Sequence, residues 1–218
     1  MKPILSIVIF LLMSFCHFIE AQSKIKLFNN KNLEGWYAYE PESGKHRTAS
    51  DIFHVDHNMI RLYGDRVGYL MSNQSFKNFK LTVEYKWNID SNFIRKSDKK
   101  NSGVMYLISA DTKDTLWPKG FQFQIKEGAT GDFVLLQDVT LFIKGLKTEP
   151  GRSVVSPRFL DAEKPIGNWN TLVINCLNGN IKQLLNGKIV NEGTLWRGQK
   201  IYCSGNIPDM KKPSFNEA

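Results

Sequence analysis

The stretch Leu81-Thr82-Val83-Glu84-Tyr85-Lys86-Trp87 alternates strictly between apolar and polar side chains. Successive side chains of a β-strand point to opposite faces, so this period of two predicts a strand with one buried face and one polar face. The stretch Phe121-Gln122-Phe123-Gln124-Ile125-Lys126 repeats the pattern, with its aromatic side chains on the buried face. These two stretches predict an antiparallel β-protein.

The rest of the 218-residue chain supports an all-β fold. The pairs Asn178-Gly179 and Asn186-Gly187 predict tight hairpin turns, because Asn-Gly tolerates the positive φ that such turns require. No long segment carries a helical stripe, and a chain of this size suits one β-sandwich domain. Strands are predicted at residues 59–62, 79–87, 103–108, 121–126, 133–136, 171–177 and 181–185.

The amino-terminal residues have the pattern of an export signal. A positive Lys2 precedes the apolar run 4–15, and a small residue, Ala21, follows. We therefore expect a signal peptide over residues 1–21 and an exported protein, periplasmic or secreted in a bacterial setting. Lipidation at Cys16 is disfavoured by the bulky Phe15 before it. No other stretch is apolar enough for stable membrane insertion, so we expect none.

Charge and cysteine content narrow the possible partners. The chain has a formal net charge of +8, but its basic residues are scattered apart from the cluster 95–100, which is typical of a solvated loop. We expect no nucleic-acid partner, and the sequence specifies no oligomeric state. After export only Cys176 and Cys203 remain, and either a disulfide or a buried thiol beside an exposed one fits them.

The polar faces of the two quoted stretches predict a ligand surface. Thr82, Glu84 and Lys86 share one face of the first, and Gln122, Gln124 and Lys126 share one face of the second. If both strands contribute to one wall, it offers the carboxylate, amide and ammonium groups that bind sugar hydroxyls. The alternative is an ordinary solvated sheet face, which antiparallel sheets commonly have.

A set of motifs, in order along the chain, resembles the 3-keto-disaccharide hydrolase family. The motifs are LFNNKNLEGW, GYL, FKNFKLTVEYKW, NSGVMYL, WPKGFQFQIKEGATGDFVLL, DAEKPIGNWNTLVI and LLNGKIVNEGT, within residues 27–194. The resemblance implies a concanavalin A-like jelly-roll sandwich over residues 25–203 and a carbohydrate substrate. It implies no cofactor, and a structural calcium site built from loop oxygens would leave little sequence trace.

The chain departs from the family pattern at several positions. Gln122 stands where the family usually has glutamate, and Gln183 stands where it often has histidine. Residues 204–218 form an atypical polar tail in place of the family's last strand, and we expect this tail to be disordered. Loss of that strand would expose a sheet edge, from which we expect reduced stability or aggregation.

The activity implied by the resemblance is cleavage of a glycoside already oxidised to a ketone at carbon 3. Such cleavage requires a base, a group that stabilises an enolate and a proton donor. Glu84 is a candidate base with Lys86 beside it, and Glu127 and Asp132 compete for the same role. Sugar-binding candidates are Tyr106, Trp117, Gln122 and Gln124.

Other functions fit parts of the sequence. A conventional retaining glycosidase of this fold commonly carries Glu-x-Asp-x-x-Glu on one strand, and no such run occurs. His46, His54 and His57 lie close in sequence, but His54 and His57 flank a predicted turn, so we expect no metal site. A non-catalytic carbohydrate-binding module is the main alternative, since Gln122 replaces the expected carboxylate. A purely structural or protein-binding role for the sandwich is the third possible function.

Overall fold

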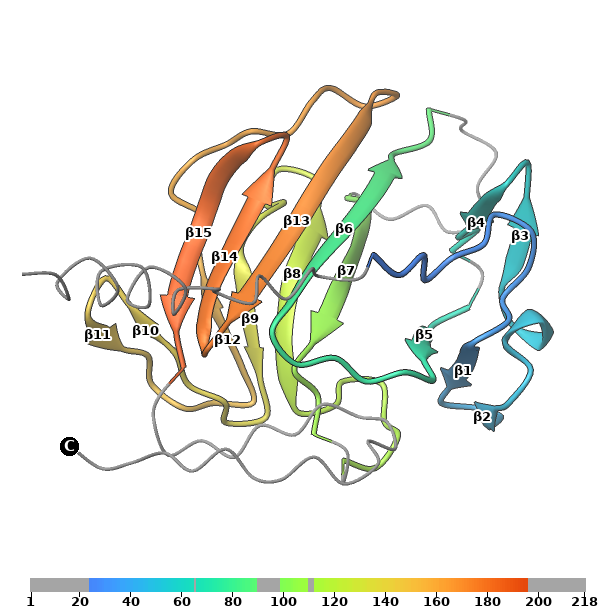
Figure 1. Cartoon of the computed structure of the whole chain (residues 1–218), viewed down its shortest axis with the longest axis horizontal. Helices are drawn as coiled ribbons and strands as arrows, with labels where there is room; N and C mark the ends of the chain where they lie inside the picture. Colours follow the sequence, from blue (N-terminus) through green and yellow to red (C-terminus); the bar gives the residue numbers. More distant parts are fainter. Residues whose placement is uncertain (1–23, 65, 90–98, 110–111, 196–218) are drawn as a thin grey trace, which may run out of the picture.

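The computed structural model describes residues 24–64, 66–89, 99–109 and 112–195 (Figure 1). The predicted signal peptide 1–21, the tail 204–218, Cys203 and most of the basic cluster 95–100 lie outside the described residues. Apart from one short 3-10 helix, η1 (Ala49–Asp51), every regular element of the described residues is a β-strand. The prediction of an all-β fold is confirmed.

Two antiparallel sheets form the main body. The large sheet has the strand order β11-β10-β15-β14-β13-β6 and the small sheet the order β12-β9-β8-β7. The strands of the large sheet are β6 (Phe79–Lys86), β10 (Phe142–Ile143), β11 (Leu146–Lys147), β13 (Trp169–Leu177), β14 (Asn180–Leu185) and β15 (Lys188–Thr194). Those of the small sheet are β7 (Asn101–Tyr106), β8 (Gly120–Lys126), β9 (Phe133–Leu136) and β12 (Ser153–Ser156).

One hydrophobic core lies between these two sheets, which makes them a sandwich. The small sheet contributes Phe121, Phe123 and Phe133, and the large sheet contributes Leu172 and Ile174, all fully buried. These residues occupy alternate positions of their strands, as the period of two predicted. The finer jelly-roll topology that the family resemblance implies stays a prediction.

A smaller unit precedes the sandwich in the chain. Its strands are β1 (Trp36–Glu40), β2 (Gly44–His46) and β5 (Tyr69–Ser72) in one sheet, and β3 (His54–Asp56) and β4 (Met59–Arg61) in a hairpin. Leu33, Ala38, Ala49 and Ile52 form its own apolar cluster. Figure 1 shows this unit beside the β6 and β7 edge of the sandwich.

The prediction of one polar wall built from both quoted stretches is wrong. β6 belongs to the large sheet and β8 to the small sheet. The apolar side chains of both strands enter the same core, from opposite sides. Their polar side chains therefore point away from each other, so Glu84 and Gln122 lie on different outward faces of the sandwich.

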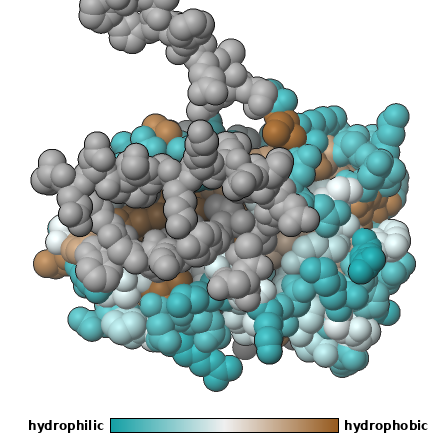
Figure 2. All heavy atoms as spheres, turned by 60° about the horizontal axis from the view of Figure 1, so that its bottom comes forward, coloured by the Kyte–Doolittle hydropathy of each residue, from teal (hydrophilic) through white to brown (hydrophobic). Residues whose placement is uncertain are grey.

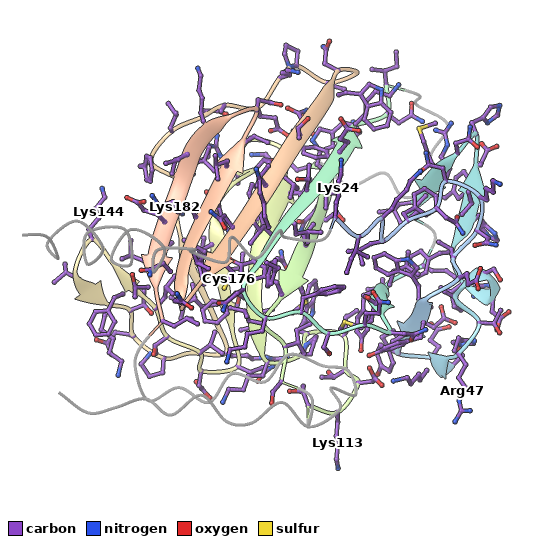
Figure 3. All side chains as sticks on the ribbon, viewed as in Figure 1. Lys24, Arg47, Lys113, Lys144, Cys176 and Lys182 are labelled. Carbon is purple, nitrogen blue, oxygen red and sulfur yellow. The ribbon has the colours of Figure 1, made fainter. Side chains whose placement is uncertain are left out.

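Asp114 joins the amino-terminal unit to the sandwich. It lies between β7 and β8, and its Oδ1 accepts hydrogen bonds from the Tyr37 hydroxyl at 2.9 Å and the Tyr69 hydroxyl at 2.6 Å. Lys45 Nζ lies 3.0 Å from its Oδ2, whereas the neighbouring Lys113 points away from the body (Figure 3). Partial burial raises the pKa of Asp114, but hydrogen bonds from Tyr69, Lys45 and Tyr37 outweigh it and lower that pKa below its ordinary value.

We expect Asp114→Asn to lower the melting temperature at pH 7 by about 2–4 °C, because the amide loses the charge that these donors stabilise. A carboxyl with a depressed folded pKa stabilises above its unfolded pKa of about 4, and this contribution is lost as the pH falls through the folded pKa. The difference between wild type and variant should therefore shrink below about pH 4. Thermal unfolding at several pH values measures this difference in melting temperature, and the exposed Asp138→Asn is the control. A difference independent of pH would contradict the assignment.

Candidate functional site

Three amide side chains form a hydrogen-bonded row on the outward face of the small sheet. Gln122 Nε2 donates to Gln124 Oε1, and Gln124 Nε2 donates to Asn101 Oδ1 at 2.8 Å. We call Asn101, Gln122 and Gln124 the amide ladder. Lys126 lies on the same face, directly opposite Asn101 in the β7–β8 register. The ladder presents fixed donors and acceptors from two paired strands, which is how rigid sites for sugar hydroxyls are built.

Gly103 allows the amide ladder to form. It lies opposite Gln124 in the register, and the side chain of Gln122 lies across it. A Cβ built on Gly103 would stand 2.6 Å from Gln122 Cδ, far inside van der Waals contact. Any other residue at position 103 would therefore displace Gln122. A glycine inside a strand often marks such a close approach.

The amide ladder lines a wide cleft between the sandwich and the amino-terminal unit. Met105, Val134 and Leu136 give the same sheet face an apolar part next to the amides. Trp117 also lines this cleft; its side chain is 46% exposed, and its carbonyl accepts a hydrogen bond from Gln137 Nε2 at 3.3 Å. The combination of amides, an apolar patch and an accessible indole suits the polar rim and apolar face of a sugar ring.

Two of the predicted carboxylates lie at the turn between β8 and β9. Glu127 directly follows Lys126, is half-buried and lines the cleft. Asp132 is 9% exposed, and its Oδ1 accepts a hydrogen bond from the Arg158 backbone N–H at 2.8 Å. That hydrogen bond gives Asp132 a structural role, because it ties the turn to the segment at Arg158. Glu84, Glu127 and Asp132 all line the cleft, and Glu127 is the one that directly follows β8, the strand that carries Gln122 and Gln124.

The other predicted pair lies on the large sheet. Glu84 is opposite Thr171 and Lys86 is opposite Trp169 in the β6–β13 register, all on the outward face. Lys86 Nζ stands 5.3 Å from the centre of the Trp169 ring, within the range of a cation–π contact. Glu84 and Lys86 therefore lie together on the large sheet and also line the wide cleft, whereas the amide ladder belongs to the small sheet.

Tyr106 does not lie where a sugar-stacking residue is needed. Its side chain points into the sandwich core and is 5% exposed. Its hydroxyl accepts a hydrogen bond from the fully buried Gln183 at 2.9 Å, and burial raises its pKa. Side chains along β7 alternate between the two faces of the sheet. Tyr106 therefore points to the opposite face from Asn101, Gly103 and Met105. The prediction that Tyr106 binds substrate is wrong.

The described part of the chain has neither a cluster of metal-binding side chains nor a membrane-spanning helix. Among the described residues, no group of three or more His, Cys, Asp and Glu side chains is placed to hold a metal ion. No helix of the described chain is long and apolar enough to span a membrane. In the view of Figure 2 the described surface is mainly hydrophilic, with its apolar side chains in separate patches.

The described chain is thus an all-β sandwich domain with a hydrogen-bonded amide row on a sheet face that lines a cleft. Residues 23–207 match the family model described as "3-keto-alpha-glucoside-1,2-lyase-like domain", and the chain belongs to this family. The family is one of carbohydrate-active enzymes and implies a sugar substrate. No curated protein matches the chain.

Among solved structures, the chain is similar to a crystal structure from Parabacteroides distasonis ATCC 8503, described as that of a "putative glycosyl hydrolase". The two share 17% sequence identity with a TM-score of 0.48, over 81% of this chain and 73% of the other.

Sequence reasoning missed part of this site. Asn101 entered only as a letter of the NSGVMYL motif, and Gly103 only there and as the first residue of the predicted strand 103–108, although a glycine in a strand was a usable signal. The hydrogen bond that joins Asn101 to Gln124 depends on the pairing of β7 with β8, which no local pattern specifies.

Proposed function

We propose that this protein cleaves glycosides whose sugar ring carries a ketone at carbon 3, by elimination followed by addition of water. The observation that carries the proposal is the amide ladder, which runs along the small sheet to Lys126 and Glu127. Membership of a family named for a 3-keto-glucoside lyase supports the substrate class and the elimination step.

The chemistry follows from the position of the ketone. A carbonyl at carbon 3 acidifies the hydrogen on carbon 2, so a base removes that proton and an enolate forms. The enolate collapses to a double bond between carbons 1 and 2 as the glycosidic oxygen leaves carbon 1 and takes up a proton. Water then adds across the double bond, with hydroxide to carbon 1 and a proton to carbon 2. The net result is hydrolysis without redox change.

Residues of the cleft supply the functions that this route requires. Glu127 is the proposed base for the carbon 2 proton, and the Lys126 ammonium is the proposed partner for negative charge on the enolate oxygen. The amide ladder holds the ring hydroxyls, and Trp117 stacks on the sugar face. The pair Glu84 and Lys86 on the large sheet is the competing assignment, and it lacks a hydrogen-bonded amide row beside it among the described residues.

Product analysis tests the proposal directly. The purified protein is incubated with 3-keto-trehalose and 3-keto-glucosides, with the unoxidised sugars as controls. We expect free sugar to be released from the keto forms alone, because only they have an acidic hydrogen at carbon 2. Release from the unoxidised sugars at a similar rate would contradict elimination and indicate ordinary glycoside hydrolysis.

A binding module without catalysis is the second candidate, and Gln122 favours it. An amide at this position accepts and donates hydrogen bonds but takes no proton, so a ladder of three amides binds sugars without chemistry. A folded protein that binds 3-keto-glycosides saturably and releases nothing from them would establish this function.

Gln122→Glu separates the two candidates. It restores the residue that the family usually carries, and in an enzyme we expect turnover to rise by about tenfold or more, as a second acid–base group enters the site. A binding module gains no turnover from the same change. The exposed Asn175→Asp, which adds the same charge at a residue that does not line the cleft, is the control. Rates of sugar release from 3-keto-glucosides measure the effect.

A further inference from the structure

A buried threonine hydroxyl makes hydrogen bonds that stabilise the turn between β8 and β9. Thr130 is fully buried, and its Oγ1 accepts a hydrogen bond from the Lys126 N–H at 3.2 Å. The same Oγ1 lies 3.0 Å from the Lys126 carbonyl oxygen and 2.9 Å from Glu163 Oε1, the two acceptors for its one proton. The backbone of Lys126 and the carboxylate of Glu163 are therefore connected through a single atom.

Glu163 connects this turn to the large sheet. Its Oε1 accepts hydrogen bonds from the Tyr85 hydroxyl at 2.8 Å and from Trp87 Nε1 at 2.9 Å, in addition to its contact with Thr130. Tyr85 belongs to β6, so one carboxylate oxygen connects both sheets of the sandwich at the same end. Burial, together with the bond to Glu163, raises the pKa of Tyr85 and keeps its hydroxyl a neutral donor at physiological pH.

Arg158 fixes the rest of the turn. Its Nη1 donates to the Gly128 carbonyl at 2.8 Å, and its backbone N–H donates to Asp132 Oδ1 at 2.8 Å. Its Nη2 lies 2.8 Å from Asp161 Oδ2, and this ion pair fixes the guanidinium against its own segment. The residues on both sides of Glu127 are thus bound to the segment 158–163.

We propose that Glu163 is a positioning residue, which sets the place of Lys126 and Glu127 in the cleft through Thr130. The inference rests on the proposed function of those two residues. Glu163 does not line the cleft, so it acts on the turn and not on the substrate. A catalytic group misplaced by about 1 Å loses about 100-fold in rate, which is the scale expected when this support is removed.

The test compares Glu163→Gln with Glu163→Ala. The amide oxygen of Gln still accepts from Tyr85, Trp87 and Thr130, so we expect kcat within about threefold of wild type. Ala removes the acceptor, and we expect kcat to fall by about 100-fold with KM changed by less than about threefold. Glu192→Ala, which removes an exposed carboxylate 3.9 Å from Lys182, is the matched control. Amide hydrogen exchange over residues 126–132 is measured on each variant.

The two readouts distinguish failure of this inference from failure of the proposed function. Faster exchange in Glu163→Ala, without a loss of kcat relative to the control, would overturn the positioning role. Unchanged exchange would overturn it as well. If the wild-type protein releases no sugar, the proposed function fails, and faster exchange over residues 126–132 in Glu163→Ala, absent from Glu163→Gln and from Glu192→Ala, would still support positioning of the turn. A loss of kcat in Ala that Gln rescues is the expected result.

Discussion

Glu127→Gln is expected to lower kcat/KM on a 3-keto-glucoside by about 100- to 10,000-fold, the range for loss of a general base. The amide has the shape of the carboxylate but accepts no proton at neutral pH, so the hydrogen at carbon 2 stays in place. Sugar binding should change little, because the amide ladder and Lys126 are untouched. Initial rates of sugar release, with binding measured by calorimetry, check both expectations.

Two further variants make this result specific. Glu84→Gln removes the competing carboxylate on the outward face of the large sheet, and the exposed Glu149→Gln is a control for loss of one negative charge. We expect activity to survive both. Loss of activity in Glu84→Gln with normal activity in Glu127→Gln would move the base to the large sheet and contradict its assignment to Glu127.

Gly103→Ala is expected to weaken binding of 3-keto-glucosides by about 10- to 100-fold, equivalent to about 1–3 kcal/mol. The new methyl group would occupy the space of the Gln122 side chain, whose Cδ lies 2.6 Å from the built Cβ. Gln122 must then leave its place, and its hydrogen bond to Gln124 is lost. Because the clashing atoms belong to a flexible side chain on the outward face, we expect the sandwich to stay folded.

A double-mutant cycle identifies the cause of the Gly103 effect. In a Gln122→Ala background the clash disappears, so Gly103→Ala should add little further loss of affinity. Affinities from calorimetry and melting temperatures are compared across the four proteins. Additive losses in the double variant would show that Gly103 acts by another route than Gln122.

The strands that sequence predicted best are those with one face in the main core. β6, β8 and β9 were found almost to the residue, because each carries apolar side chains at alternate or successive buried positions. β1, β2 and β5 were missed, since their half-buried side chains mix aromatic and polar groups and show no clear period. A strand that packs against a large core has apolar residues at regular positions, and this pattern allows it to be predicted from a single sequence.

The candidate site was only half predictable for a physical reason. Alternation along one strand correctly placed Gln122, Gln124 and Lys126 on one face of β8. It did not show which strands share a sheet. Glu84 was therefore predicted on the same wall as Gln122, although the two residues belong to different sheets. Tyr106 was predicted to bind sugar, although its side chain lies in the core. Glu163 was invisible, because its role depends on three donors distant in sequence.

The central claim is that the protein removes the hydrogen at carbon 2 of a 3-keto-glycoside before the glycosidic bond breaks. The most direct measurement follows a 3-keto-glucoside carrying deuterium at carbon 2, with rates and products compared to the unlabelled sugar. The account predicts slower release, loss of the deuterium to water and an enone that precedes the final sugar. Equal rates with the deuterium retained in the product would contradict it.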